Sequence, residues 1–414
     1  MQAAVAHLVS PASDHSPLLL KFSLEQDRRP RSSRRYELMW ERSPALEAII
    51  ANSWSSKGTK RNLGDVREAL ATVMADLHTW SNKTFGNVTR ELEKSRTRLE
   101  ELTNMNADRA EIRLEMDKMN ELLYREEMLW LQRSRIVWLK EGDRNTKMFH
   151  RKAVWRARKN KIRGLADEAG VMHTDQANML QMVKCYFHNL FTADPMLDPH
   201  DVLQLIQPTV SAEMNNHLCK EFTDEEISNA MFQIGPLKAP GPDGFPARFF
   251  QRHWAVMKDD IINVVKLFFA SGVMPDGINS TVIVLIPKID SPSRLTDFRP
   301  ISLCNVIYKV IAKFLVNRLR PILDELVSPE QSAFVPGRLI TDNALIAFEC
   351  FHAIKQEKDP EQSFCAYKLD LSKAYDRVDW VFLERVMQQM GFSHRWVDWI
   401  MRCVTSVRYT VKFN

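Results

Sequence analysis

Apolar residues recur at helical spacing in the first half of the chain. Steps of three, four and seven positions place them on one stripe of a helix. The pattern changes phase near Asn106, so it predicts two long helices folded back on each other as an antiparallel hairpin. We expect a structural spacer here rather than a coil for a specific partner. The apolar positions are Val88, Leu92, Leu99 and Leu102 before the change, and Ile112, Met116, Met119, Leu123, Trp130 and Val137 after it.

The chain as a whole mixes helical and strand patterns, which predicts an α+β fold. Strand patterns occur at 18–22, 281–286, 364–371 and 407–413. Helical patterns occur at 45–160, 227–234, 247–271, 307–322, 339–354, 380–390 and 393–403.

Several short motifs predict where these elements begin and end. Thr223 and Glu226 have the spacing of a capping box, while Gly391 is suited to end one helix and Ser393 to cap the next. Residues 238–246 contain three prolines and two glycines in nine positions. Such a stretch predicts an irregular loop of fixed shape.

The composition is that of a globular protein with room for two or three domains: 414 residues, 45% hydrophobic and 26% charged. The six cysteines form no C-x-x-C pair and no zinc-ligand spacing with histidine. No signal peptide and no run of about 18 apolar residues is evident. We therefore expect an intracellular protein, in the nucleus or the cytoplasm, that does not enter a membrane.

The net charge of +5 hides a strong local bias. Between Arg133 and Arg163 there are twelve lysines and arginines against two acids. The aromatic residues Phe149, His150 and Trp155 are interleaved with them. Cations neutralise phosphates and aromatic rings stack on bases, so nucleic-acid binding is one interpretation. The other is a solvated helix whose aromatic rings pack inward, and the sequence leaves both open.

The segment Tyr367–Asp376 combines an apolar strand pattern with a single carboxylate, Asp370, and an aromatic ring, Tyr375. A strand end would hold the carboxylate firmly, as Mg²⁺-dependent nucleotide transfer requires. One acid is insufficient for two metal ions, and an isolated Asp at a strand end is most often solvated or a helix cap. The adjacent pair at 259–260 falls in a predicted helix, where we expect it to face solvent.

Three cations surround a predicted strand–loop–strand segment: Lys288, Arg294 and Arg299. Their side chains are suited to donate to triphosphate oxygens. On spacing alone, surface charges around a hairpin are the simpler interpretation.

From about residue 210 onward the sequence resembles the reverse transcriptases of non-LTR retrotransposons, most closely the plant LINE type. The matching stretches, in order, are 238–254 (KAPGPDGFPARFFQRHW), 284–320 (beginning VLIPKIDSPSRLTDFRPISL), 331–345 (QSAFVPGRLITDNAL) and 368–380 (KLDLSKAYDRVDW). The resemblance implies the fingers and a partial palm of a right-hand polymerase, preceded by a long helical linker.

The resemblance also implies roles for single residues. Asp370 binds the catalytic Mg²⁺ ions and the backbone carbonyl of Leu371 joins it. Tyr375 excludes the ribose 2′-hydroxyl of the incoming nucleotide. Lys288 and Arg299 approach the triphosphate.

Two further arginines have looser implied roles. Arg294 and Arg338 help to hold the template or the fingers. Arg294 is also a third candidate for the triphosphate contact, and which of Lys288, Arg294 and Arg299 makes that contact stays open.

The implied partners are an RNA template, a DNA primer or target, and deoxynucleoside triphosphates. The implied reaction is attack of a primer 3′-hydroxyl on the α-phosphate with two Mg²⁺ ions. The alternative is an inactive remnant of such an element that only binds nucleic acid. Oligomeric state, template and target preference, and independent activity stay open.

Upstream, Asp14 and His15 lie in a short stretch that resembles the last motif of an apurinic-type endonuclease, with His15 as general base and Asp14 assisting with metal or orientation. We accordingly expect four parts: an endonuclease remnant with a basic linker at 1–40, a helical hairpin with a basic linker at 45–165, a connecting region at 166–222, and the fingers with an incomplete palm at 223–414. The family's second acidic motif, an aromatic residue followed by Ala-Asp-Asp, does not occur in the sequence. We expect the chain to be a segment of a longer open reading frame.

Overall fold

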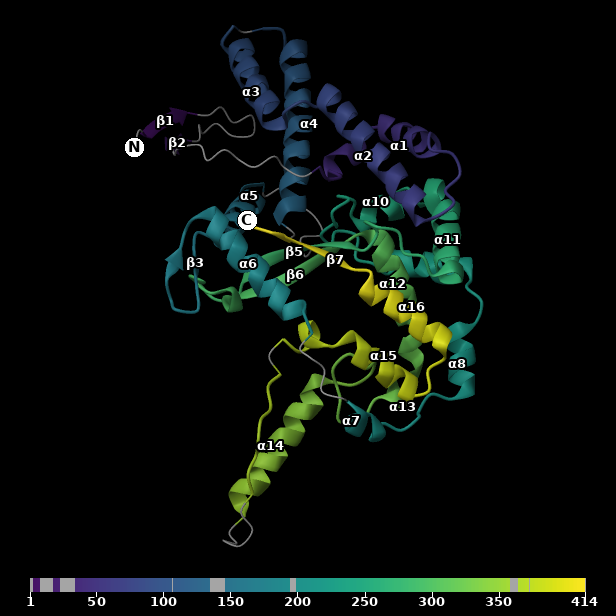
Figure 1. Ribbon diagram of the computed structural model, residues 1–414. Helices are drawn as coiled ribbons and strands as arrows, with labels where there is room; N and C mark the ends of the chain where they lie inside the picture. The colour runs from purple at the N-terminus through teal and green to yellow at the C-terminus, as the bar shows by residue number, and fades with distance from the viewer. Residues whose placement is uncertain are drawn as a thin grey trace. The chain divides into compact units, whose positions relative to one another are not determined.

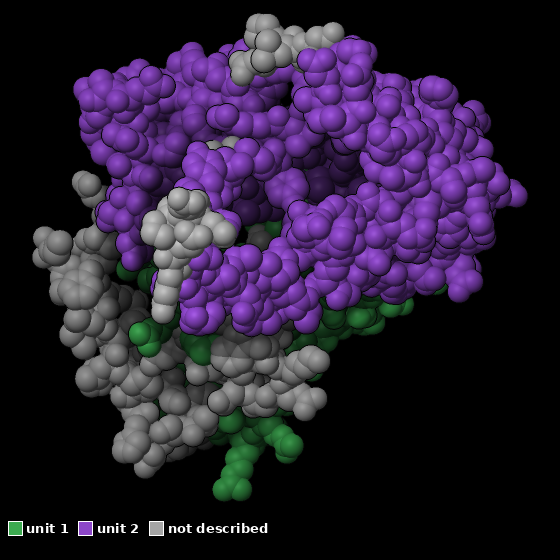
Figure 2. Space-filling view, turned by 90° about the horizontal axis from the view of Figure 1, so that it is seen from below, with its two compact units in different colours: residues 1–60, 65–161, 236–257 green, residues 61–64, 162–235, 258–414 purple. Residues whose placement is uncertain are grey.

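A computed structural model describes residues 3–7, 18–22, 34–105, 107–134, 146–193, 199–357, 364–371 and 373–413. Their contacts group into two compact units, coloured separately in Figure 2. Unit 1 consists of residues 1–60, 65–161 and 236–257, and unit 2 of residues 61–64, 162–235 and 258–414. Both units combine segments that are far apart in the sequence, and the four predicted parts stay predictions.

Unit 1 contains the predicted helical hairpin (Figure 1). Helix α3 (Val88–Asn104) packs against α4 (Arg109–Ser134). Ser95 Oγ donates to a carboxylate oxygen of Glu115 across the pair, at 2.6 Å. The prediction of two helices folded back on each other is confirmed. The buried core of this hairpin is Leu92, Leu99, Met119 and Leu122.

The remaining elements of unit 1 lie on both sides of this hairpin in the sequence. Strands β1 (Ala3–His7) and β2 (Leu18–Phe22) pair antiparallel, which confirms the strand predicted at 18–22. The predicted helical region from 45 onward is divided into α1 (Ala45–Ser55), α2 (Leu63–Thr84), α3, α4 and α5 (Thr146–Asn160). A 3₁₀ helix, η1 (Leu38–Arg42), precedes them.

The loop predicted at 238–246 is irregular, and its backbone contacts the segment at 34–36. The N–H of Tyr36 donates to the carbonyl of Gly244 at 3.1 Å. Gly244 has φ +82°, and a Cβ there would lie 2.5 Å from the carbonyl oxygen of Arg34. Only glycine fits this close approach. In α10 (Ala247–Arg252), the guanidinium of Arg248 donates to both carboxylate oxygens of Glu41, at 2.6 to 2.9 Å.

The helix predicted at 247–271 is interrupted, and in that respect the prediction was wrong. Helix α10 ends at Arg252. The next residue, His253, has φ −101° and ψ 24°, and α11 (Trp254–Ser271) begins directly after it. The apolar spacing runs on through the break, which is why periodicity alone misses it.

Unit 2 is built around a sheet of three strands in the order β6-β5-β7. Strand β5 (Ser280–Pro287) pairs antiparallel with β6 (Phe298–Cys304) and parallel with β7 (Arg408–Lys412). Alternate residues of β5 are buried, so one face of the sheet carries the core. The strands predicted at 281–286 and 407–413 are both confirmed.

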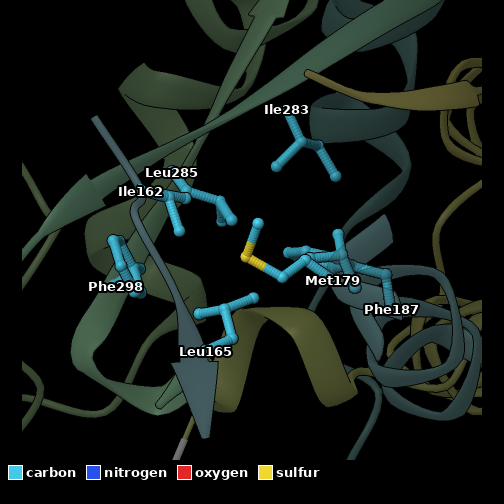
Figure 3. Close-up of a cluster of buried hydrophobic side chains, with 8 residues drawn as sticks. Ile162, Leu165, Met179, Phe187, Ile283, Leu285 and Phe298 are labelled. Carbon is cyan, nitrogen blue, oxygen red and sulfur yellow. The ribbon is translucent and has the colours of Figure 1, made fainter. Parts of the chain in front are cut away.

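The core on that face is shown in Figure 3, where apolar side chains point toward one another around Met179. It joins the sheet to α6 (Gln176–Phe191) and to the small hairpin of β3 (Leu165–Ala166) and β4 (Met172–His173). Its buried members are Ile162, Leu165, Met179, Val183, Phe187, Ile283, Leu285 and Phe298.

The other helices of unit 2 include α8 (Ala212–Cys219), α9 (Asp224–Phe232), α12 (Val306–Leu319) and α16 (His394–Thr405), with the capping box at Thr223 and the Ser393 cap as predicted. The shorter elements are α7 (His200–Gln204), η2 (Leu295–Asp297), η3 (Arg320–Ile322), α13 (Leu323–Leu326) and α15 (Trp380–Gln389).

Arg318 on α12 is only 2% exposed and joins several of these helices. It donates to the carboxylate of Glu226 at 3.0 Å and to the carbonyl of Leu218 at 3.0 Å, and its guanidinium lies 4.4 Å from the centre of the Phe222 ring. The buried charge is therefore fully compensated.

Helix α14 (Ile340–Gln356) is confirmed at its predicted position, but it extends away from the other helices of unit 2 (Figure 1). None of its residues is buried. The strand predicted at 364–371 is wrong: these residues form no strand, and all of them are exposed. A strand requires a neighbour to pair its backbone groups, and no described residue pairs with this segment.

No helix in the described part of the chain is long and apolar enough to cross a bilayer.

Candidate active site

Asp370 and Leu371 lie in the exposed segment before η4 (Ala374–Arg377), not at the end of a strand. Within the described ranges, no group of three or more His, Cys, Asp or Glu side chains is placed to hold a metal ion. Mg²⁺ is commonly held by one or two carboxylates together with substrate phosphates. The Asp370 carboxylate and the Leu371 carbonyl provide oxygen donors of the kind that Mg²⁺ prefers. They could supply two ligands of such a site, and the other ligands would have to come from elsewhere.

Tyr375 is exposed by 76%, and its position is set by its neighbours. Lys373, just before η4, has a φ of +54°. Its ammonium lies 4.1 Å from the centre of the Tyr186 ring on α6. Burial lowers the pKa of Lys373, and the charge of Asp376 opposes that change. The ring of Phe334 meets Tyr375 edge-on at 5.8 Å.

Sequence reasoning missed Lys373, Tyr186 and Phe334. Phe334 also has a positive φ, +67°, a conformation that sequence does not report for a residue other than glycine. The sequence could have indicated Lys373, because it lies between Asp370 and Tyr375.

Lys288 and Arg299 belong to the β5–β6 hairpin and lie on one face of it. Arg299 is the cross-strand partner of Ile286, so these two share a face. Lys288 follows Ile286 by two positions and continues that face. Its Nζ donates to the carbonyl of Thr296 at 3.0 Å. The predicted strand–loop–strand is therefore confirmed, and it places both cations opposite the core shown in Figure 3.

Arg294 lies in the loop of this hairpin, at the start of η2. Its backbone N–H donates to the carboxylate of Asp297 at 2.9 Å, and that of Ser293 donates to the same carboxylate at 3.0 Å. These two hydrogen bonds lower the pKa of Asp297. The loop is therefore held by its backbone, and the side chain of Arg294 is exposed.

Arg338 stabilises a turn. Its guanidinium donates to the carboxylate of Asp324 at 2.8 Å and to the carbonyls of Val327 at 2.9 Å and Gln331 at 2.8 Å. These contacts hold the loop before α14, so a direct template contact of Arg338 stays a prediction.

All of these residues belong to unit 2. Among the described residues, no hydrogen bond or ion pair joins Asp370 to Lys288, Arg294 or Arg299. Asp14 and His15 lie outside the described residues, so the endonuclease remnant stays a prediction.

Comparison with known proteins bears on these residues. Residues 286–414 match the family "Reverse transcriptase (RNA-dependent DNA polymerase)". That stretch contains Lys288, Arg299, Asp370 and Tyr375.

Curated relatives come from retrotransposable elements. The chain is 30% identical over 283 residues to the transposon TX1 uncharacterized 149 kDa protein of Xenopus laevis, which covers 68% of this chain and 21% of the relative. It is 26% identical over 168 residues to the Pol polyprotein of the type-2 element R2DM of Drosophila melanogaster, covering 41% of this chain and 15% of the relative. The corresponding protein of the R1 element of Bradysia coprophila is 24% identical over 160 residues, covering 38% and 15%.

The chain thus spans about a fifth of the length of the TX1 relative and less of the other two. The TX1 alignment is longer than the stretch that the family matches, so the similarity extends upstream of Ile286. The reverse transcriptase match over 286–414 and the similarity to retrotransposon proteins together support a non-LTR reverse transcriptase.

Proposed function

We propose that the chain carries the fingers and part of the palm of an RNA-directed DNA polymerase. The observation that carries the proposal is the family match over 286–414. Within that stretch, Lys288 and Arg299 lie on one face of the β5–β6 hairpin, and Asp370, Leu371 and Tyr375 are exposed. The proposed partners are an RNA template, a DNA primer or target, and deoxynucleoside triphosphates.

In the proposed reaction, the primer 3′-hydroxyl gives its proton to solvent water, and its oxygen bonds to the α-phosphorus. The bond from that phosphorus to the bridging oxygen of the β-phosphate breaks, and pyrophosphate leaves. Bound Mg²⁺ would neutralise charge on the reacting phosphate. Asp370 would hold it with a carboxylate oxygen and Leu371 with its carbonyl oxygen, and further carboxylates would have to join them.

Lys288 and Arg299 bind the β- and γ-phosphates in this proposal, because their shared face presents two donors of positive charge. Tyr375 bounds the sugar of the nucleotide. Arg294 lies in the loop and not on the strand face that carries Lys288 and Arg299. We therefore assign it a weaker contact with the same anion or with template phosphates.

The test is incorporation of labelled deoxynucleotides on a poly(rA) template with an oligo(dT) primer, in this chain and in the longest polypeptide that contains it. Asp370→Ala abolishes incorporation if the proposal is right. Asp259→Ala is the matched control, because Asp259 is an exposed acid on α11. Salt-dependent RNA binding without synthesis by any form would instead support the inactive remnant.

A further inference from the structure

Helix α5 is the most basic element that the structure describes. Its fifteen residues include six lysines and arginines and no acid. One side of it faces α4: Phe149 is 2% exposed, the ring of His150 meets Trp130 at 4.3 Å, and Arg156 donates to the carbonyl of Ser134 at 3.1 Å. This face anchors the helix in unit 1.

The opposite face is centred on Trp155, which is 58% exposed. Four cations lie three or four positions from it, one turn before and one turn after, and all four are exposed: Arg151, Lys152, Arg158 and Lys159. Residues at these spacings share a helix face. The ammonium of Lys159 lies 5.1 Å from the centre of the Trp155 ring. A large flat ring is thus surrounded by positive charge.

Neighbouring helices show what an ordinary solvated face looks like. In α3 and α4, four of the nine lysines and arginines pair with acids one turn away: Lys94 with Glu91, Arg98 with Glu101, Lys118 with Glu115 and Arg125 with Glu121. On α5, by contrast, no carboxylate among the described residues forms an ion pair with Arg151, Lys152 or Arg158. The same unit thus pairs several cations with acids on two helices, whereas on α5 the exposed Arg151, Lys152 and Arg158 have no such pair among the described residues.

We propose that this face of α5 binds an unpaired RNA strand, with a base stacked on Trp155 and the flanking cations on phosphates. Stacking requires an accessible base face, which a duplex does not offer. A membrane is disfavoured because a helix lying in a bilayer surface needs a broad apolar face, whereas the apolar side of α5 is turned toward α4. The choice of RNA over DNA rests on the proposed function.

The experiment measures binding of a fluorescent 20-nucleotide unstructured RNA by anisotropy, with the whole chain. Trp155→Ala weakens binding about tenfold, since one stacked base contributes roughly 1–3 kcal/mol. Trp155→Phe restores most of the affinity because it keeps a ring. Arg151→Ala with Lys152→Ala lowers the slope of log affinity against log salt by about 1.4, or roughly 0.7 for each phosphate that is no longer neutralised.

The matched control is Arg98→Ala with Arg113→Ala, which removes two exposed cations from α3 and α4 and leaves affinity and salt slope unchanged. Equal affinity of wild-type protein and Trp155→Ala overturns the proposal, as do tighter binding of duplex, single-stranded DNA or phosphatidylserine vesicles. The incorporation assay tests the proposed function separately. If the protein binds RNA but does not synthesise DNA, the proposed function fails and the RNA-binding proposal stands.

Discussion

The Tyr375 ring is open to solvent and meets the edge of the Phe334 ring. Two positions before it, Lys373 has a left-handed backbone and contacts Tyr186. An exposed ring at this place is suited to bound a nucleotide pocket. The proposed role is thus a steric one, and it can be tested by changing the size of this side chain.

We expect Tyr375→Ala to admit ribonucleotides, because the smaller side chain leaves space for a 2′-hydroxyl. The measurement is the ratio of incorporation of deoxy- and ribonucleotides on an RNA template. Tyr375→Phe is the control, since it keeps the ring and the selectivity. An unchanged ratio in Tyr375→Ala would rule out the ring as the selecting group.

His253, between α10 and α11, is a buried histidine whose pKa is lowered to about 4, first by burial and next by the charge of Arg252. The unfolded chain therefore takes up a proton near pH 6.5 that the folded chain takes up only near pH 4. This group contributes stability above pH 6.5 that is lost as the pH falls from 6.5 toward 4, with a slope of up to about 1.4 kcal/mol per unit.

The check on His253 is the urea midpoint at pH 7 and pH 5. The wild-type urea midpoint is lower at pH 5 than at pH 7. His253→Leu reduces this difference because it removes the titrating group. His188→Gln, at an exposed position, leaves the difference unchanged. An identical pH dependence in His253→Leu would contradict this explanation.

At the scale of elements, local patterns predict the α3–α4 hairpin, the capping box at Thr223 and the β5–β6 hairpin, because each depends on residues close in the sequence. The strand expected at 364–371 did not form, since strand structure depends on a distant partner. The partners of Arg318 and the αL conformation of Lys373 are likewise set by contacts that no short pattern encodes. Of the candidate site, sequence therefore predicted the residue types and not their surroundings.

The hairpin core makes a quantitative prediction. Leu99→Ala removes a buried side chain between α3 and α4 and lowers the free energy of unfolding of this hairpin by about 2–5 kcal/mol. Leu114→Ala is the control on α4, because Leu114 is 72% exposed. The measurement is the hydrogen-exchange rate of the α3 and α4 amides in each of the two variants. Equal exchange rates in the two variants would show that Leu99 does not pack as described.

At the scale of the whole molecule, the two units carry different chemistry. Unit 1 contains the basic face of α5, and unit 2 contains Lys288, Arg299, Asp370 and Tyr375. This division predicts that binding of nucleic acid and transfer of nucleotides are separable by mutation. Variants of α5 affect RNA affinity, while Asp370→Ala affects synthesis and leaves RNA affinity unchanged.

The most direct test of the polymerase assignment is the rate of deoxynucleotide incorporation by Asp370→Ala divided by the rate of Asp259→Ala, measured at equal RNA occupancy. Loss of a metal ligand removes several kcal/mol of transition-state stabilisation, so we predict a ratio of about 0.01 or lower. A ratio near one would contradict the assignment of Asp370 as a catalytic metal ligand.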